Sequence, residues 1–463
     1  MNALDQVDQT PANGYLSLGE AARALKVTKP RVSQLIAEGS LRGMLIGGRR
    51  VVEHGSLERY AEGAHERGQN PTPERFTLMS ADYEVAQVSY TAGREAPLAV
   101  GEVLDAARMP FGTLASTGSP RPRAVNDWWL HRSVPSSRPG MLSKLEELGV
   151  GDVQRLPLRS LGLSLSDCYW LRPAGHEDLA WGSINYFEND FTGAGSDTWD
   201  EWLGAVGLGS PDNTSEGELP KRWAIDRGAR VLVKGCTTDD QRPFNEVVAT
   251  ALHRRLLREG EYVPYSIVHV QNEPACLCPD FLTLREEYIP ATYVRGSLGN
   301  TRGSSTYDRF ARYAGRWLCD ENAARTALSQ MIVCDSVIAN GDRHWRNFGF
   351  IRSVDTLEMR PAPLFDSGNS LWFDKPTGAL RAGDWSFPAR PFDLHPERQL
   401  ALADRLDWFD PARLQGFADE AVEILRGSSS AYEGGRIDRI AQGLQRRVQE
   451  VSTAVEVLRH VPR

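Results

Sequence analysis

The sequence contains no apolar run of about 18 residues, the length that a helix needs to cross a bilayer. Its first residues, MNALDQVDQTPANG, lack the basic start and the apolar stretch of a secretory signal. From Phe76 onward it also lacks internal repeats and low-complexity tracts. We therefore expect a cytoplasmic protein without membrane helices, and 463 residues predict two or three globular domains.

Cysteine is scarce, with six scattered residues and a single close pair, Cys276 and Cys278. One intervening residue is fewer than zinc sites usually have, and no second pair is present to complete four ligands. We therefore expect reduced thiols rather than a zinc site.

The chain as a whole also has no excess of positive charge. The net charge of -8 argues against general coating of nucleic acid. Between Tyr15 and Val52, however, there are seven basic residues and only two acidic ones. This local positive charge indicates a small module that can approach an anionic partner such as DNA.

The same segment has the pattern of two short helices followed by a hairpin. Ser17 and Glu20 form a predicted capping box for the first helix. Thr28 is suited to cap the second helix. Two strands are expected on either side of a Gly-Gly turn, over residues 41–46 and 49–52.

This pattern resembles the winged helix-turn-helix of the MerR and excisionase families. The resemblance implies that the second helix enters the major groove and that the hairpin reaches phosphates. The residues that would contact DNA are Lys29, Arg31, Ser33, Gln34, Arg49 and Arg50. Because helix-turn-helix proteins often bind DNA as dimers on two half-sites, a homodimer is a secondary expectation. The alternative is a module that docks onto protein, with its arginines merely solvated.

The rest of the chain combines strands and helices. After Tyr60 the polar stretch EGAHERGQNPTPER predicts a linker. A short apolar strand over Val231–Lys234 precedes a helical pattern over Asn245–Leu257. Apolar residues from Ile437 to Val455 step by three and four, which predicts a long amphipathic helix near the end.

The densest polar pattern is NGDRHWRN, which follows an apolar helix. Asp342 and Asn347 are five residues apart, so they can converge on a loop but would diverge on a helix. A strand over Phe348–Ile351 and a second one ending at Leu364–Phe365 would return Asp366 beside them. One carboxylate could then orient a hydroxyl, while the amide oxygen and the other carboxylate bind magnesium. Phosphoryl transfer requires such a set.

This segment resembles the catalytic loop of HipA-like kinases, which reads N-x-D-x-H-x-x-N before an aspartate at a strand end. The sequence matches at Asn340, Asp342, His344, Asn347 and Asp366. The resemblance implies that Asp342 is the catalytic base and that Asn347 and Asp366 bind Mg²⁺. Asn340 and His344 would support the loop.

Three upstream segments resemble the ATP-binding parts of the same kinases. VLVKG and PFNEVVATAL look like the nucleotide-lysine strand and the helix whose glutamate pairs with that lysine. The resemblance gives these roles to Lys234 and Glu246. ACLCPDFLTLREEYIPA looks like the hinge between the lobes, where backbone groups near Asp280 to Thr283, those of Asp280 and Phe281 among them, would bind adenine.

The stretch SPDNTSEGELPKRW resembles the phosphate-covering loop of HipA-like kinases, although it lacks the G-x-G-x-x-G of protein kinases. Gly217 and Lys221 fit the family pattern. Thr214 stands at the position of an autophosphorylated hydroxyl and Ser215 adjoins it, so either one is the implied phosphosite. An ordinary surface loop is the alternative.

Together these patterns predict an α+β chain: a winged helix-turn-helix, then a two-lobed protein-kinase-like fold of the HipA type with a mainly helical C-terminal lobe. The expected ranges are 1–62 for the DNA-binding domain, 63–75 for the linker, 76–284 for the N-terminal lobe with an extension, and 285–463 for the C-terminal lobe.

The resemblance implies an ATP- and Mg²⁺-dependent Ser/Thr protein kinase of toxin–antitoxin type, with a protein acceptor and, in the family, a separate antitoxin partner. Two alternatives belong to other classes. One is a transcriptional regulator whose kinase-like domain senses nucleotide without catalysis. The other is a small-molecule or lipid phosphotransferase, because the D-R-H-x-x-N pattern also resembles phosphatidylinositol-kinase loops.

Overall fold

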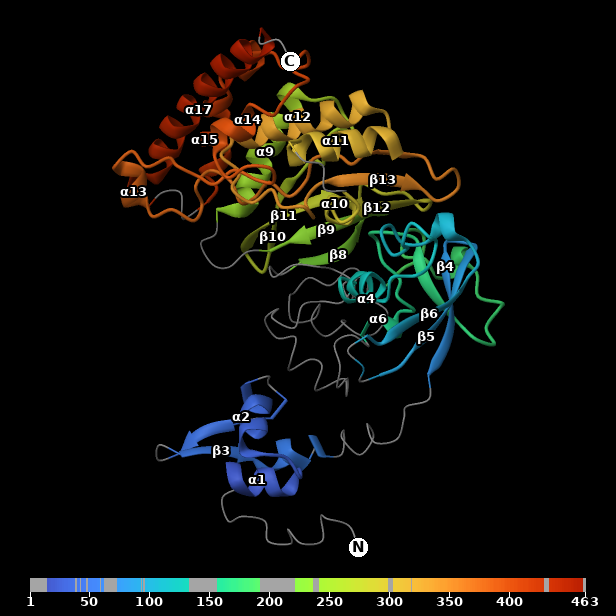
Figure 1. Ribbon diagram of the computed structural model, residues 1–463. Helices are drawn as coiled ribbons and strands as arrows, with labels where there is room; N and C mark the ends of the chain where they lie inside the picture. The colour runs from blue at the N-terminus through green and yellow to red at the C-terminus, as the bar shows by residue number, and fades with distance from the viewer. Residues whose placement is uncertain are drawn as a thin grey trace, which may run out of the picture. The chain divides into compact units, whose positions relative to one another are not determined.

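A computed structural model divides the chain into two compact units, Met1–Glu74 with Thr91–Glu95, and Arg75–Tyr90 with Ala96–Arg463 (Figure 1). Within the described residues no helix is long and apolar enough to span a membrane. The structure describes residues 15–37, 40–41, 43–46, 49–58, 60–61, 73–92, 94, 96–132, 156–191, 221–235, 241–298, 303–317, 319–428 and 433–460.

The first unit contains the expected winged helix-turn-helix elements. Its antiparallel sheet has the order β1-β3-β2. The predicted capping box is confirmed, since the Ser17 hydroxyl accepts the Glu20 N–H and the Glu20 carboxylate accepts the Ser17 N–H. Val32 and Leu35 of the second helix are buried against the first helix and the sheet. The elements are β1 (Tyr15–Ser17), α1 (Leu18–Ala24), α2 (Lys29–Ala37), β2 (Gly43–Ile46) and β3 (Arg49–Glu53).

The second unit begins with a four-stranded antiparallel sheet of order β6-β5-β4-β7, which we call the extension together with its short helices. Its buried ring-bearing side chains include Trp129, Trp170 and Trp181. The elements are β4 (Glu74–Ser80), β5 (Tyr83–Tyr90), β6 (Leu98–Val103), η2 (Ala106–Arg108), α4 (Pro122–Leu130), α6 (Leu156–Arg159), β7 (Tyr169–Pro173) and α7 (Trp181–Ile184).

A second antiparallel sheet, of order β10-β11-β9-β8, forms the small lobe together with one helix, α9, that packs on β10 and β11. The predicted strand and helix are confirmed, and each begins two or three residues earlier than the sequence pattern indicated. The elements are β8 (Lys221–Asp226), β9 (Ala229–Lys234), α9 (Arg242–Leu256), β10 (Ser266–Val270) and β11 (Glu273–Pro279).

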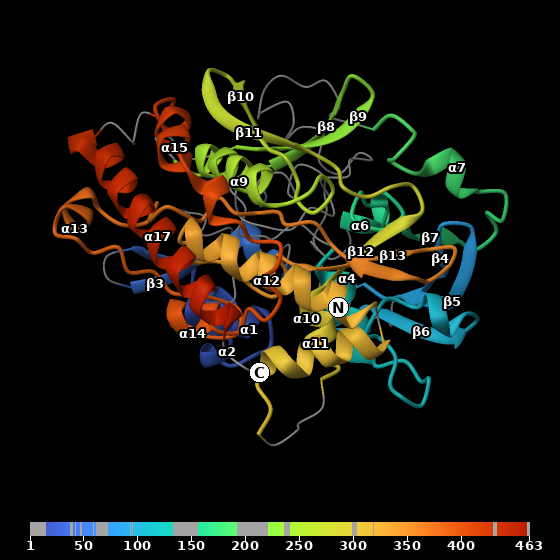
Figure 2. The same cartoon turned by 90° about the horizontal axis from the view of Figure 1, so that it is seen from above.

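The large lobe is mainly helical, and its small sheet has the order β12-β13-β14 (Figure 2). The predicted long amphipathic helix is confirmed as α17. The elements are β12 (Glu286–Pro290), α10 (Ala291–Arg295), α11 (Thr306–Trp317), α12 (Glu321–Val337), β13 (Gly349–Ser353), β14 (Met359–Pro361), α13 (Thr377–Arg381), α14 (Pro396–Leu400), η5 (Pro411–Leu414), α15 (Phe417–Leu425), η6 (Glu433–Gly435) and α17 (Arg436–Arg459).

The prediction of a second strand that ends at Leu364–Phe365 is wrong. The strand β14 ends at Pro361, and Pro363 follows, so neither proline can donate an N–H to a sheet. Leu364 instead forms a parallel bridge with Tyr262, and its carbonyl accepts the Val263 N–H at 2.8 Å. The segment that leads into Asp366 is therefore held by the chain of the small lobe.

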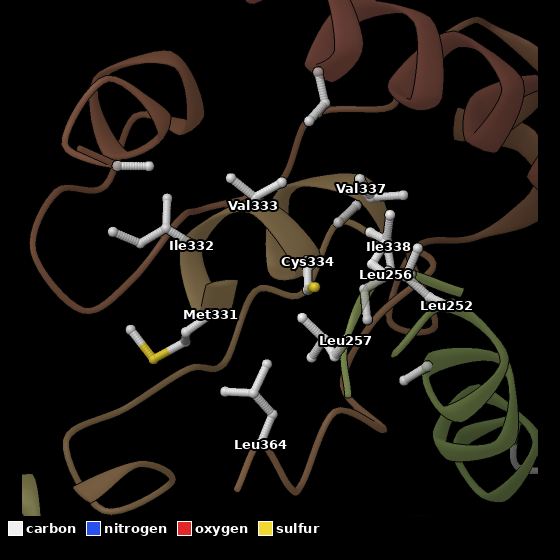
Figure 3. Packing of buried hydrophobic residues seen from close by; sticks show 14 of the residues in the cluster. Leu252, Leu256, Leu257, Met331, Ile332, Val333, Cys334, Val337, Ile338 and Leu364 are labelled. Carbon is white, nitrogen blue, oxygen red and sulfur yellow. The ribbon is translucent and has the colours of Figure 1, made fainter. Parts of the chain in front are cut away.

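One apolar core joins the two lobes, because α9 of the small lobe packs against α12 and α15 of the large lobe. Leu252 and Leu256 of α9 belong to the same buried apolar cluster as Val333 and Val337 of α12 (Figure 3). Burial of each such side chain contributes about 1.5–3 kcal/mol relative to exposure. The relative position of the polar groups on these two helices is thus fixed by packing.

The pairing of β12 with β13 leaves no room for a side chain at Gly349. A Cβ there would overlap the carbonyl oxygen of Ile289 on the neighbouring strand. We expect Gly349→Ala to destabilise the protein by about 1–3 kcal/mol, the usual range for overpacking. Thermal unfolding measures the effect. Gly378→Ala on α13, where nothing lies within 4 Å of the new Cβ, is the control. Equal melting temperatures of the two variants would contradict the close approach.

Candidate active site

A cleft of about 630 Å³ is lined by residues of both lobes and of the extension. The structure brings most of the predicted ATP, metal and base residues to this one place. Those that line the cleft are Lys221, Lys234, Glu246, Asp280, Phe281, Asp342, His344, Asn347 and Asp366. Thr214, Ser215 and Gly217 lie outside the described residues.

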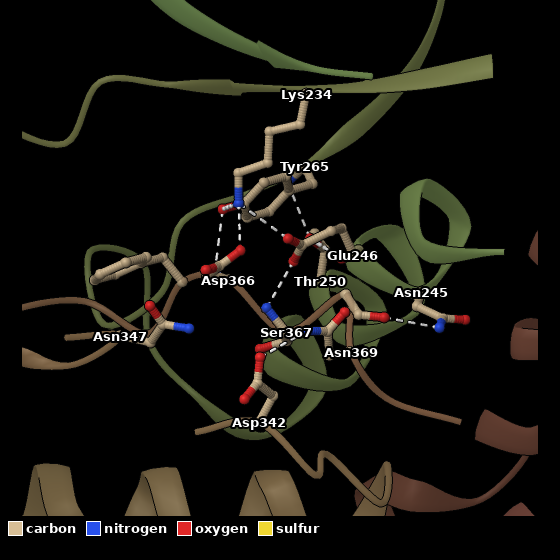
Figure 4. A network of polar contacts seen from close by, with 12 residues as sticks. Lys234, Asn245, Glu246, Thr250, Tyr265, Asp342, Asn347, Asp366, Ser367 and Asn369 are labelled. Carbon is tan, nitrogen blue, oxygen red and sulfur yellow. Dashed lines mark hydrogen bonds and ion pairs between the residues drawn. The ribbon is translucent and has the colours of Figure 1, made fainter. Parts of the chain in front are cut away.

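The Lys234 ammonium is the centre of the polar network (Figure 4). It donates to a carboxylate oxygen of Asp366 at 2.7 Å and to one of Glu246 at 3.1 Å. It also donates to the Tyr265 hydroxyl at 3.1 Å. The end of β9, the first turns of α9 and the segment after β14 therefore meet at a single positive charge.

These contacts decide the protonation of the three charged groups. Burial by itself would lower the pKa of Lys234, but Asp366 and Glu246 hold it well above its usual range. Burial would raise the pKa of Asp366, but the Lys234 ammonium holds it well below the usual range. Burial raises the pKa of Glu246 despite the same lysine. Of the two carboxylates, Asp366 is therefore the one whose ionised form is favoured.

The backbone around Asp366 is bent so that its side chain turns toward Lys234. Asp366 has a φ of 56°, in the left-handed region that few residues other than glycine adopt. Its N–H donates to the Tyr265 hydroxyl, and the Ser367 N–H donates to Glu246 at 2.8 Å. Two hydrogen bonds that the turn donates to side chains of the small lobe therefore stabilise this strained backbone.

Lys221 lies directly opposite Lys234 in the antiparallel ladder of β8 and β9. Both residues line the cleft, and the charge of Lys221 contributes to the low pKa of Asp366. Two lysines and one ionised aspartate at one end of the cleft suit an anion together with a hard cation.

The residues predicted to form the hinge follow β11. The Asp280 N–H donates to the Arg230 carbonyl, and one oxygen of its carboxyl group accepts the Leu282 N–H at 3.0 Å. Burial raises the pKa of Asp280 to about 8. The Phe281 ring stacks on Phe365 with centroids 5.3 Å apart, which gives this end of the cleft an aromatic wall.

Asp342 projects from a loop that its neighbours hold in place. The Asp342 N–H donates to the Asn340 side chain, which in turn donates to Asp335 at 2.8 Å. One carboxylate oxygen of Asp342 accepts the Asn369 amide N–H at 2.7 Å. The other lies 3.3 Å from the Arg390 guanidinium. Asp342 is therefore oriented while about a third of its side chain stays exposed.

Arg343, which the sequence analysis passed over, braces this loop. It is fully buried and donates twice to Asp335, at 2.8 and 2.9 Å. It also donates to the carbonyls of Asn347 and Phe365 and to the Ser367 hydroxyl. One guanidinium thus links the residues before Asp366 to the residues after Asp342.

Among the described residues, the hydrogen bonds of His344 lie within its own loop. Its carbonyl accepts the Asn347 N–H at 2.9 Å, and its Nδ1 accepts the Arg346 N–H at 3.2 Å. These short-range bonds close the turn that brings Asn347 back toward the cleft.

Asn245 is a second residue that sequence reasoning missed. It is fully buried in α9 and donates to the carbonyls of Gly368 and Ser370. Gln241 donates to the Asn245 side chain and accepts from the buried Arg436 of α17. The sequence does contain a signal for Asn245, which is a polar residue within an otherwise apolar helical face. A residue at such a position is buried only when its hydrogen bonds are satisfied, so it predicts polar partners in the fold.

The residues present fit a magnesium ion. Asn347 supplies an amide oxygen and Asp366 an ionised carboxylate, and both line the same cleft. In the part of the chain that the structure describes, no cluster of three His, Cys, Asp or Glu side chains forms a dedicated metal cage. This donor set suits Mg²⁺, which binds one or two carboxylates and completes its shell with waters and substrate phosphates.

The candidate DNA-contacting residues lie on the second helix and the hairpin of the first unit. Lys29, Arg31 and Gln34 are exposed on α2, and Ser33 is partly exposed. The backbone of Arg49 and Arg50 forms the start of β3.

Comparisons with known proteins find different relatives for the first unit and for the rest of the chain. Residues 15–65 match the family model of a helix-turn-helix domain. The chain is 26% identical over 106 residues to the serine/threonine-protein kinase CtkA of Helicobacter pylori. That match covers 22% of this chain and 33% of the relative, so the similarity spans a third of its length.

Two solved structures are similar. The crystal structure of the Helicobacter pylori proinflammatory kinase CtkA gives a TM-score of 0.43 at 16% identity, over 54% of this chain and 94% of that one. A chain of the Shewanella oneidensis MR-1 toxin–antitoxin complex of HipA, HipB and operator DNA gives 0.52 at 16% identity, over 84% of this chain and 100% of that one. The second likeness confirms the predicted HipA-like kinase fold.

The buried carboxyl group of Asp280 predicts a pH-dependent stability. An unfolded aspartate has a pKa near 3.9, whereas burial raises that of Asp280 to about 8. Between these values the folded protein keeps a proton that the unfolded chain has lost, so the free energy of unfolding falls as pH rises. Asp280→Asn should remove this loss, which is at most about 1.4 kcal/mol for each pH unit.

Urea unfolding at about pH 5 and pH 7 measures the difference. We expect Asp280→Asn to gain stability over the wild type mainly at the higher pH. Asp226→Asn, at the exposed end of β8, is the matched control. Parallel pH profiles for the wild type and Asp280→Asn would show that Asp280 is ionised in the folded state.

Proposed function

We propose that the chain is an ATP- and Mg²⁺-dependent Ser/Thr protein kinase of the HipA type. The observation that carries the proposal is the convergence of Lys234, Glu246 and Asp366 with Asp342 and Asn347 in one cleft. Each side chain is of the type that phosphoryl transfer requires at that point. The HipA-like fold supports the same reaction class.

The residues divide the work by their charge and position. Lys234 and Lys221 would neutralise phosphate oxygens, with Glu246 holding the Lys234 stem in place. Asn347 and Asp366 would hold Mg²⁺, which neutralises phosphate charge when bound. Asp342 would accept the proton of the acceptor hydroxyl, since Asn369 and Arg390 orient its two oxygens while 37% of the side chain stays exposed to the cleft.

A protein that only senses nucleotide would need the lysines and the metal ligands but not an oriented base. Asp342 is instead positioned by three neighbours, Asn340, Asn369 and Arg390. This arrangement favours catalysis over the nucleotide-sensing alternative. Autophosphorylation at Thr214 or Ser215 stays a prediction from the sequence.

For the first unit we propose DNA binding in cis, through α2 and the β2–β3 hairpin. The support is the helix-turn-helix match over residues 15–65 and the exposed polar side chains of α2. The solved HipA complex contains HipB and operator DNA. By analogy, a separate antitoxin-like partner and a homodimer on paired half-sites belong to the same proposal.

Removing the base should separate binding from chemistry. Asp342→Asn should slow transfer from labelled ATP by about 100-fold or more while ATP affinity stays near that of the wild type. Asp366→Asn should lose transfer and also the Mg²⁺-dependent part of nucleotide affinity. Asp384→Asn, which removes a surface aspartate that pairs with Lys375, should leave both properties unchanged. Near-normal transfer by Asp342→Asn would remove it from the catalytic role.

DNA binding should depend steeply on salt. The full-length protein should bind a fragment of its own upstream region more weakly as salt increases. Arg49→Ala with Arg50→Ala should lower affinity for all sequences and reduce the salt slope by about 0.9 per lost phosphate contact. Changes at Arg31 or Gln34 should alter sequence preference instead. Fluorescence anisotropy measures each effect, and no binding at low salt would favour the protein-docking alternative.

A further inference from the structure

The segment that leads into Asp366 is paired with the stretch of chain just before β10. The Leu364 N–H donates to the Glu261 carbonyl at 2.9 Å, and the Leu364 carbonyl accepts the Val263 N–H at 2.8 Å. Two residues further on, the Asp366 N–H donates to a side chain instead of the backbone, the Tyr265 hydroxyl, at 3.3 Å. Tyr265 therefore continues this short pairing as far as the aspartate itself.

The same hydroxyl receives a hydrogen bond from the Lys234 ammonium at 3.1 Å (Figure 4). A hydroxyl oxygen has two lone pairs, so the Lys234 ammonium and the Asp366 N–H together use its capacity to accept. Burial raises the pKa of Tyr265 well above its usual range, so the hydroxyl keeps its proton and stays neutral. One neutral oxygen thus touches both the proposed phosphate-binding lysine and the backbone of the proposed metal ligand.

The position of Tyr265 is itself fixed by the small lobe. Its N–H donates to the Thr250 hydroxyl at 2.9 Å, and that hydroxyl donates to the Glu246 carbonyl one turn earlier in α9 at 2.9 Å. The Tyr265 side chain lines the cleft but is only 7% exposed, and it belongs to the same apolar cluster as Val263 and Cys278. Packing of the ring and a bond from its backbone therefore hold the hydroxyl in place.

An ammonium group has three N–H donors, and Lys234 directs them to three acceptors, which are Asp366, Glu246 and Tyr265. A phosphate oxygen that binds Lys234 must therefore replace one of these partners. Asp366 is the partner that would be released, because an ionised carboxylate is the type of ligand that Mg²⁺ prefers. The two bonds to the Tyr265 hydroxyl involve no carboxylate oxygen, so they can persist while the charged partners exchange.

We propose that Tyr265 is a positioning residue that couples nucleotide binding to metal binding, because its hydroxyl keeps Lys234 and Asp366 in place relative to each other. The inference rests on the proposed kinase function and adds a residue that acts through the lysine and the aspartate. A coupling free energy is reciprocal, so Mg²⁺ strengthens ATP binding by the same factor by which ATP strengthens Mg²⁺ binding. Loss of the hydroxyl should reduce that factor more than it reduces the affinity for metal-free nucleotide.

Tyr265→Phe is the decisive variant because it removes the hydroxyl and leaves the buried ring. Calorimetric titration of the full-length protein with AMP-PNP, a non-hydrolysable ATP analogue, gives the affinity in EDTA and in saturating Mg²⁺. We expect the strengthening by Mg²⁺ to be about 10-fold smaller in Tyr265→Phe than in the wild type, the size of one hydrogen bond to a charged group. The affinity in EDTA should fall by at most about 3-fold, because Glu246 still holds Lys234.

Two further variants accompany it, and melting temperatures check the folding of each. Tyr262→Phe is the matched control, since Tyr262 is not among the described residues that line the cleft, and it should behave as the wild type. Thr250→Val removes the hydroxyl that accepts the Tyr265 N–H. It should reduce the strengthening by Mg²⁺ by about 3-fold, the size of one neutral hydrogen bond, and it decides the test if Tyr265→Phe does not fold.

The outcomes separate the two proposals. Equal strengthening by Mg²⁺ in Tyr265→Phe and in the wild type would overturn the role of Tyr265 and leave the kinase proposal intact. An equal loss of affinity in EDTA and in Mg²⁺ would also overturn it, since a merely structural role gives that result. If Mg²⁺ does not strengthen binding of the analogue to the wild type and labelled ATP transfers phosphate to no acceptor, the kinase proposal fails and the coupling fails with it.

Discussion

The site depends on one ammonium group. Lys234 pairs with Asp366 and Glu246 and so joins three segments that are far apart in the chain. Removing the charges of Lys234 and Glu246 from water costs several kcal/mol per ion, and the cost is offset only when the partners and hydrogen bonds are complete. Here the Tyr265 hydroxyl and the Ser367 N–H complete them. The two lobes must therefore be docked correctly before the network can form.

A second buried cation, Arg343, gives the loop of Asp342 and Asn347 its rigidity. Arg343 satisfies Asp335 and three further oxygen acceptors, and no water can reach it. Losing one partner would leave an unpaired charge inside the large lobe, which typically costs about 3–5 kcal/mol. The loop that carries Asp342 and Asn347 is thus prevented from moving independently of the turn at Asp366. Rigid placement of this kind is what lets a site act by positioning rather than by covalent chemistry.

The electrostatics of the cleft change from its inner end to its mouth. At the inner end positive and negative groups are paired, as Lys234 is with Asp366. Nearer to solvent, Arg390 lies 3.3 Å from Asp342 and 45% of its side chain is exposed, compared with 14% for Lys234. The buried end, where the charges are paired, suits a nucleotide with its metal.

The sequence by itself determined the local elements and the residue types of the site. The Ser17–Glu20 capping box, the strand that ends at Lys234 and the period of α17 are short-range patterns, and all three are confirmed. The spacing of Asp342 and Asn347 indicated a loop, because five residues on a helix would separate them. These signals depend on neighbours within one or two turns of chain, which is why one sequence is enough to read them.

Only the tertiary structure decided which contacts form between these local elements. The strand expected to reach Phe365 stops at Pro361, because Leu364 finds its partner at Tyr262 in the small lobe. Arg343, Asn245 and Arg390 have roles set by partners 8 to 125 residues away in the chain. The periodicity of the sequence does not predict such contacts. The position of a buried polar side chain depends on the donors and acceptors that the packing of helices and strands brings next to it.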